Sequence, residues 1–141
     1  MGKSIKTHID NFIRFNESNV TNIILGEIDR WETQFDIKKE DINKGDCYIF
    51  AENLESLIDG CEILTTDLFY NLANRDEYTE GEDDEIWSKE EDYNSFKPDK
   101  LEWPKNGYHG WIYVNGKHYD AEMVEGVVNF YDLPIFKRYI K

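Results

Sequence analysis

The chain has 141 residues and a formal net charge of −14, and 40% of its residues are hydrophobic. This length fits one domain with a hydrophobic core. The acidity argues against direct nucleic-acid binding, which needs a basic footprint, and against binding to anionic membrane surfaces. It is compatible with solubility, with a basic protein partner, or with mimicry of the charge of a nucleic acid.

The cysteine content and the N-terminal residues indicate the cellular setting. The sequence contains two cysteines, Cys47 and Cys61, too few for a disulfide framework or a four-thiolate zinc site. The N-terminal stretch lacks the apolar segment of a signal peptide, and no apolar run is long enough for a membrane span. We therefore expect a soluble cytoplasmic protein with reduced thiols, no cofactor and no bound metal.

The first part of the chain has helical periodicity. Apolar residues recur at roughly helical spacing over residues 4–15, and again over residues 20–35. Polar, cap-forming residues at 16–19 interrupt the pattern and predict a break between two helices. Residues 1–43 are thus predicted to be the N-terminal helical part of a single domain that spans residues 1–141.

A third helix is predicted within residues 44–59. Its apolar stripe consists of Cys47, Phe50, Ala51, Leu54, Leu57 and Ile58. Asp46 is the expected N-cap, and Gly60 lies where the helix should end. Cys47 therefore lies in the first turn, where free N–H groups and the positive end of the helix dipole favour a thiolate. A buried free cysteine is also a common core residue, so both interpretations stay open.

The middle of the chain changes character twice. Within the segment 44–75, residues 62–66 predict a short strand or an extended stretch, and a short helix should follow near Leu68. Residues 76–100 are rich in aspartate and glutamate and lack periodicity. This composition is typical of a solvated loop, and a lid over a functional site is the alternative.

The C-terminal part, residues 101–141, contains the clearest pattern in the sequence. Two runs of strand-forming residues flank Asn115-Gly116, which predicts a β-hairpin with a type I′ turn. A third strand is expected at 127–130, and a last turn or short helix after Pro134. Helices followed by strands predict an α+β fold, with the cysteine-bearing helix packed on a small antiparallel sheet.

The hairpin register predicts a catalytic arrangement. Pairing of Val114 with Lys117 places six side chains on one face: His109, Trp111, Tyr113, His118, Asp120 and Glu122. His109 and Asp120 are diagonal neighbours within reach of a hydrogen bond, and Glu122 competes for the same role. The Cys47 helix is expected to dock on this face. Cys47 would then be the nucleophile, His109 the base and later the acid, and Asp120 the group that orients His109.

The other candidate residues are interpreted as structural. We expect Cys61 to be structural and His118, beside the turn, to face solvent. Trp111, Tyr113 and Tyr119 fit sheet packing, with Trp111 at the side of a cleft. Metal binding by Cys47, His109, His118 and Asp120 is conceivable, but no local ligand spacing supports it.

Three sequence patterns resemble a known superfamily. They are Gly45-Asp46-Cys47-x-x-Phe50-Ala51, the hairpin His109-x-Trp111 through Gly116 to Tyr119-Asp120-Ala121, and Leu133-Pro134-x-Phe136. The order of Cys, His and Asp resembles the papain-like cysteine hydrolases, including the NlpC/P60-like and transglutaminase-like members. The three patterns together resemble small phage and bacterial proteins over roughly residues 44–136.

The resemblance implies a papain-like core and a thiol hydrolase or acyl-transfer enzyme acting on an amide or thioester-like bond, such as that of a peptide. Papain-like peptidases usually carry a glutamine shortly before the cysteine, whereas this chain has Asp41 and Asn43 there. Asn43 and the Cys47 N–H are the candidate oxyanion donors. The alternative is a non-catalytic acidic protein, phage-encoded and located in the host cytoplasm, that blocks a basic surface of a host defence protein.

Overall fold

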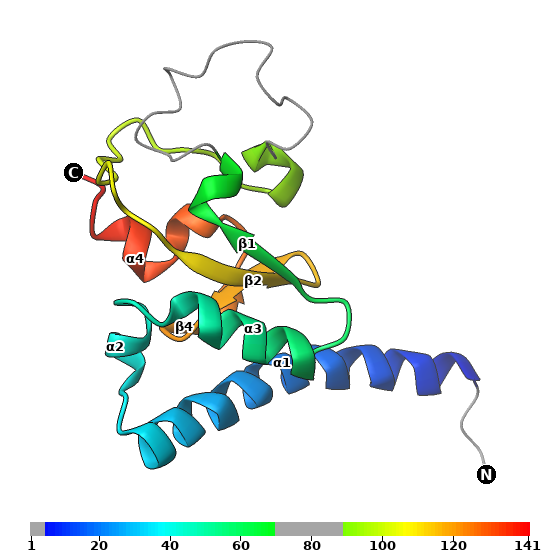
Figure 1. Cartoon of the computed structure of the whole chain (residues 1–141). Helices are drawn as coiled ribbons and strands as arrows, with labels where there is room; N and C mark the ends of the chain where they lie inside the picture. Colours follow the sequence, from blue (N-terminus) through cyan, green and yellow to red (C-terminus); the bar gives the residue numbers. More distant parts are fainter. Residues whose placement is uncertain (1–4, 70–88) are drawn as a thin grey trace.

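The structure of the chain is a computed structural model. It describes residues 5–69 and 89–141, and it describes side chains from residue 19 onward. In these residues the helices α1 (Ile5–Phe35), α2 (Lys39–Ile42) and α3 (Cys47–Leu57) precede the strands of the sheet (Figure 1). The strands are β1 (Glu62–Thr65), β2 (Gly110–Val114), β3 (Lys117–Asp120) and β4 (Met123–Val127). The short helix α4 (Pro134–Lys137) follows, and the α+β class predicted from the sequence is confirmed.

The described strands form one antiparallel sheet in the order β1-β2-β3-β4. β2 and β3 make the predicted hairpin, with Val114 paired to Lys117 and Tyr113 to His118. Asn115 and Gly116 have φ angles of 55° and 77°, which are the positive values that a type I′ turn requires. The register predicted from two turn residues is therefore confirmed.

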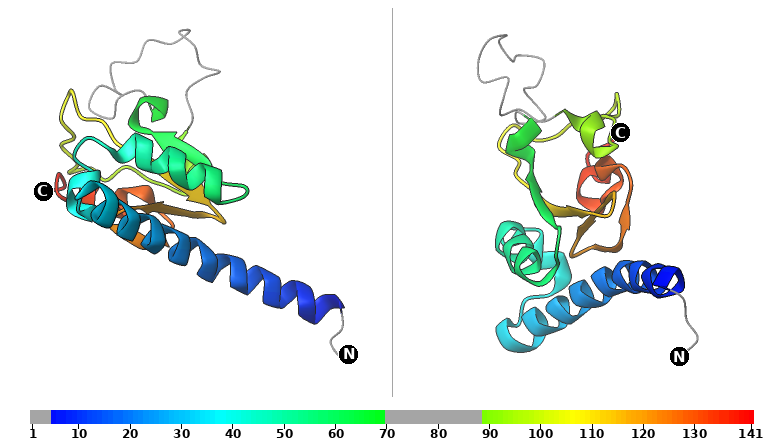
Figure 2. Two further views of the ribbon diagram at one scale, coloured as in Figure 1. Left: turned by 60° about the horizontal axis from the view of Figure 1, so that its bottom comes forward. Right: turned by 90° about the vertical axis from the view of Figure 1, so that its right-hand side faces the viewer.

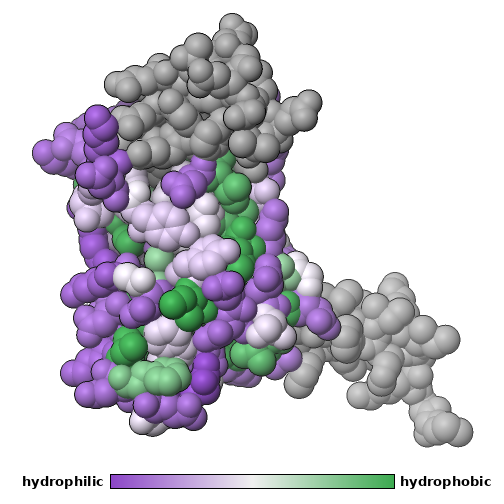
Figure 3. Space-filling view, viewed as in Figure 1, coloured by the Kyte–Doolittle hydropathy of each residue, from purple (hydrophilic) through white to green (hydrophobic). Residues whose placement is uncertain are grey.

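Two layers of helices cover the sheet. α1 and α3 lie against one face, and the 3-10 turns and α4 lie against the other (Figure 2). The strand residues alternate accordingly: Ile112 and Tyr119 belong to the cluster under α1 and α3, whereas Trp111 belongs to the opposite cluster. Hydrophilic side chains dominate the surface seen in Figure 3, in keeping with the charge of the chain.

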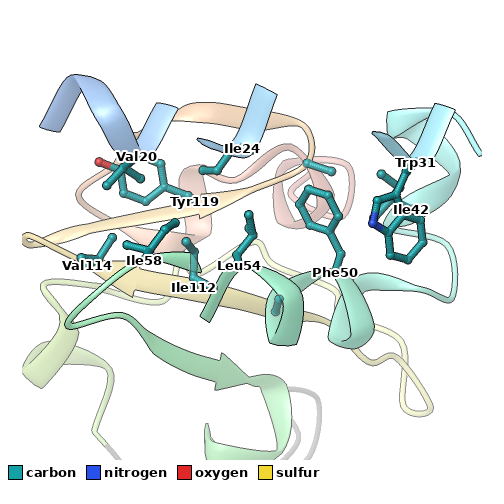
Figure 4. Close-up of a cluster of buried hydrophobic side chains, with 12 residues drawn as sticks. Val20, Ile24, Trp31, Ile42, Phe50, Leu54, Ile58, Ile112, Val114 and Tyr119 are labelled. Atoms are coloured by element: carbon teal, nitrogen blue, oxygen red, sulfur yellow. The ribbon is translucent and has the colours of Figure 1, made fainter. Parts of the chain in front are cut away.

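The core between α1, α3 and the sheet anchors the helix that carries Cys47. Leu54 of α3 and Ile24 of α1 are fully buried in this cluster together with Ile112 of β2 (Figure 4). Phe50 packs edge-to-face on Trp31, with ring centroids 5.7 Å apart. These contacts fix α3 along its length, so its first turn cannot shift without disturbing the core.

Two element predictions were wrong. α1 is one continuous helix rather than two, because residues 16–19 carry cap-forming side chains but contain neither proline nor glycine to stop the helix. The strand after the hairpin is Met123–Val127 rather than 127–130. Asn129 instead begins the 3-10 turn Phe130–Asp132, where its Oδ1 accepts a hydrogen bond from the Tyr131 N–H at 3.0 Å.

The predicted acidic loop is only partly described. Its residues 76–88, and with them the proposed lid, lie outside the described residues. Residues 89–100 are not simply solvated, because they contain the 3-10 turn Glu90–Tyr93 and the buried Ser95. The hydroxyl of Ser95 accepts a hydrogen bond from the Phe130 N–H at 2.8 Å.

Candidate active site

The predicted histidine–carboxylate pair is formed. Nε2 of His109 lies 3.0 Å from Oδ2 of Asp120, and both side chains are buried. The other carboxylate oxygen, Oδ1, accepts a hydrogen bond from the Glu122 N–H at 2.9 Å. Because both oxygens have partners, the carboxylate holds one orientation, and it fixes the proton of His109 on Nε2.

Glu122, the competing partner for His109, has a different role. Its Oε1 accepts a hydrogen bond from Nδ2 of Asn43 at 2.9 Å, and its Oε2 pairs with Arg138. Asn43 lines the same narrow crevice as Cys47. One amide proton of this candidate oxyanion donor is therefore used to tie the segment before α3 to the end of the hairpin.

Aromatic rings hold the His109 imidazole in place. The Trp111 ring is nearly parallel to it, with an interplanar angle of 15° and centroids 5.6 Å apart. The Phe136 ring meets it edge-on at 5.8 Å. Trp111 is fully buried, so it supports the histidine from inside. It does not flank an open cleft, contrary to the prediction.

α3 does not dock on the sheet face that carries His109. Phe50 and Leu54 pack on the opposite face, against Ile112, because the face of His109 is already covered by its own aromatic cluster. Only the first turn of α3 reaches the end of β2, where the Gly110 N–H and the His109 ring act on the Cys47 thiol. The first turn of α3 thus lies near His109, although the rest of the helix packs on the other face of the sheet.

The thiol and the imidazole shift each other's pKa in opposite directions. Burial alone would raise the pKa of Cys47, but hydrogen bonding to His109, its positive charge, and the backbone N–H groups of Gly110 and Tyr48 lower it. Burial alone would lower the pKa of His109, but Asp120 and Cys47 raise it to about 9. Both directions favour a thiolate–imidazolium pair at neutral pH.

The second ring nitrogen of His109 is available for chemistry. Nδ1 is buried, and among the described residues it makes no hydrogen bond of ordinary geometry. Since Nε2 is bound to Asp120, Nδ1 is the nitrogen through which the ring acts on Cys47. Its position suits a base that takes a proton from sulfur and later returns it.

His118 is the clearest wrong prediction for a single residue, because it is fully buried rather than exposed to solvent. Its Nδ1 accepts a hydrogen bond from Nε1 of Trp111 at 2.9 Å, and its Nε2 donates to the carbonyl of Tyr93 at 2.7 Å. Burial lowers its pKa to about 4, so it is neutral. The pKa values of two histidines on one face thus shift in opposite directions, because only His109 has a carboxylate beside it.

The two cysteines also differ. Cys61 is half-buried, and burial together with the negative charges of Glu55 and Glu62 raises its pKa to about 12. Among the described groups that shift the pKa of Cys61 there is no histidine. Within the described residues no cluster of histidine, cysteine and carboxylate side chains is suited to a metal ion.

Two tyrosines beside the thiol were missed by the sequence analysis. Tyr48 follows Cys47 and Tyr108 precedes His109, and each is 42% exposed. Burial and the nearby negative charges of Cys47, Asp67, Tyr48 and Glu52 raise the pKa of Tyr108 to about 12. Each tyrosine is adjacent in the sequence to a predicted catalytic residue, and this adjacency could have indicated that it lies near the site.

No protein-family model, curated protein or solved structure matches the chain. Among the described residues, no helix is both long and apolar enough to cross a membrane.

Proposed function

We propose that the protein is a papain-like thiol hydrolase or acyl-transfer enzyme with Cys47, His109 and Asp120 as its catalytic residues. The observation that carries the proposal is the buried His109 ring, with Nε2 held by Asp120 at 3.0 Å and the unpartnered Nδ1 on the side of Cys47. A ring that only filled the core would not need a carboxylate on one nitrogen and a thiol on the other.

In the proposed reaction the Cys47 thiolate attacks the carbonyl carbon of an amide or thioester. The negative charge then developing on the carbonyl oxygen would be stabilised by the Cys47 N–H, since the first N–H groups of a helix have no acceptor within it. His109 gives its Nδ1 proton to the leaving nitrogen or sulfur, and an acyl-Cys47 thioester forms. Water, deprotonated by His109, or another nucleophile then releases the acyl group.

An activated ester tests this proposal without knowledge of the substrate. With p-nitrophenyl acetate, we expect a burst of p-nitrophenolate of about one equivalent and the mass of one acetyl group on the peptide that contains Cys47. Cys47→Ala should abolish the burst, and Cys61→Ala should retain it. Acetylation of both cysteines at equal rates, or of neither, would contradict the proposal.

The alternative of an acidic blocking protein rests mainly on residues 76–92. Most of these lie outside the described residues, and in the described part no observation favours this function over catalysis.

A further inference from the structure

The surface around Cys47 has an aromatic border. A methyl group at the Cβ position of Gly110 would lie 3.5 Å from Cδ2 of Tyr48 and 3.7 Å from the hydroxyl oxygen of Tyr108. Both rings therefore border the same small space next to the sulfur, and both are half-exposed. Two tyrosines in this position offer flat, partly apolar surfaces to a bound side chain.

Two exposed carboxylates extend this border. Glu52 lies one turn after Tyr48 on the same side of α3. Asp67 is placed beside Tyr108 by the backbone, because the Thr66 N–H donates to the carbonyl of His109 at 3.0 Å. In the part of the chain that the structure describes, neither carboxylate forms an ion pair.

We propose that Tyr48, Glu52, Asp67 and Tyr108 form a subsite for a positively charged side chain next to the scissile bond, so that the substrates are lysine- or arginine-containing peptides. This inference rests on the proposed function of Cys47. Carboxylates attract a cation, and tyrosine rings bind it by cation–π contact. Both carboxylates lie close enough to Tyr108 for their charges to help raise the pKa of its hydroxyl.

The face of the molecule that carries α3 and β1 agrees with a mixed site of this kind. Side chains of intermediate hydropathy lie there between hydrophilic and hydrophobic ones (Figure 3). The total charge of −14 also attracts cations. At physiological ionic strength, however, salt screens charges that lie more than about 8 Å away. At that salt concentration, the local carboxylates should therefore determine the charge preference.

Two methanethiosulfonate reagents test the subsite, because they share one reactive group and differ in charge. One carries a trimethylammonium group and the other a sulfonate. In a Cys61→Ala background at physiological salt, we expect the cationic reagent to modify Cys47 about tenfold faster than the anionic one. Combining Glu52→Gln with Asp67→Asn should reduce this ratio about fivefold, whereas Glu125→Gln, an exposed change on β4, should leave it unchanged.

The outcomes separate the subsite from the proposed function. Rapid modification of Cys47 with the same charge ratio in the double variant and in Glu125→Gln would overturn the subsite and leave the poised thiolate intact. Slow modification by both reagents would overturn the thiolate and, with it, the subsite. Circular dichroism of each variant checks that these surface changes leave the fold intact.

Discussion

His109→Gln should slow the alkylation of Cys47 by iodoacetamide at pH 7 by about tenfold or more. The imidazolium is the main group that lowers the pKa of Cys47, and glutamine has a similar size but carries no charge. An ordinary thiol with a pKa near 8.5 is only about 3% ionised at pH 7, so a Cys47 that is fully ionised in the wild type would lose up to about 30-fold of its thiolate. The greater nucleophilicity of a more basic thiolate offsets part of this loss.

Asp120→Asn is the second variant in this test. It should also slow alkylation, but less, because the imidazole stays in place while losing the carboxylate that favours its charged form. Glu125→Gln is the control and should react like the wild type. Unchanged rates in both His109→Gln and Asp120→Asn would show that the three side chains do not act together.

Trp111→Ala should lower the free energy of unfolding by about 3–5 kcal/mol, a large share of the 5–15 kcal/mol typical of a domain. Trp111 is fully buried at the centre of the aromatic cluster on the His109 face of the sheet. Its ring contacts those of Phe69, His109, His118, Phe130 and Phe136. Removing it leaves a cavity and also leaves His118 without its hydrogen-bond donor.

Urea denaturation followed by circular dichroism measures this effect. Trp111→Phe should cost about 1–3 kcal/mol, since it keeps much of the ring but leaves Nδ1 of His118 unsatisfied. Phe96→Ala, at a side chain that is 65% exposed, should change the stability by less than about 0.5 kcal/mol. A loss below about 1 kcal/mol for Trp111→Ala would contradict the packing described for this face.

The hairpin was predictable because its information is local. Asn115-Gly116 permits the positive φ angles of one turn type, and that turn determines the three residue pairs that join β2 and β3 next to it. That register placed both Asp120 and Glu122 within reach of His109. It did not decide between them, because Glu122 is bound by Asn43 and Arg138, which lie outside the hairpin.

The wrong predictions depend on tertiary contacts. His118 is next to a turn and looked exposed, but it is covered by Tyr93, which belongs to a segment without periodicity. The face on which α3 docks was not predictable either, since both faces of the sheet are apolar and only the packing decides which is covered by which helices. Tyr48 and Tyr108 lie close together only because β2 lies beside the first turn of α3, and this contact could not be predicted from the sequence.

The central claim, a Cys47 thiolate stabilised by His109, is tested most directly by alkylation of the two cysteines as a function of pH. Each cysteine is followed by mass spectrometry after treatment with iodoacetamide. We predict that at pH 7 Cys47 reacts at least about tenfold faster than Cys61, whose pKa is raised to about 12, and that its rate changes little through neutral pH. Equal labelling, or a Cys47 rate that rises about tenfold per pH unit up to pH 8, would contradict the claim.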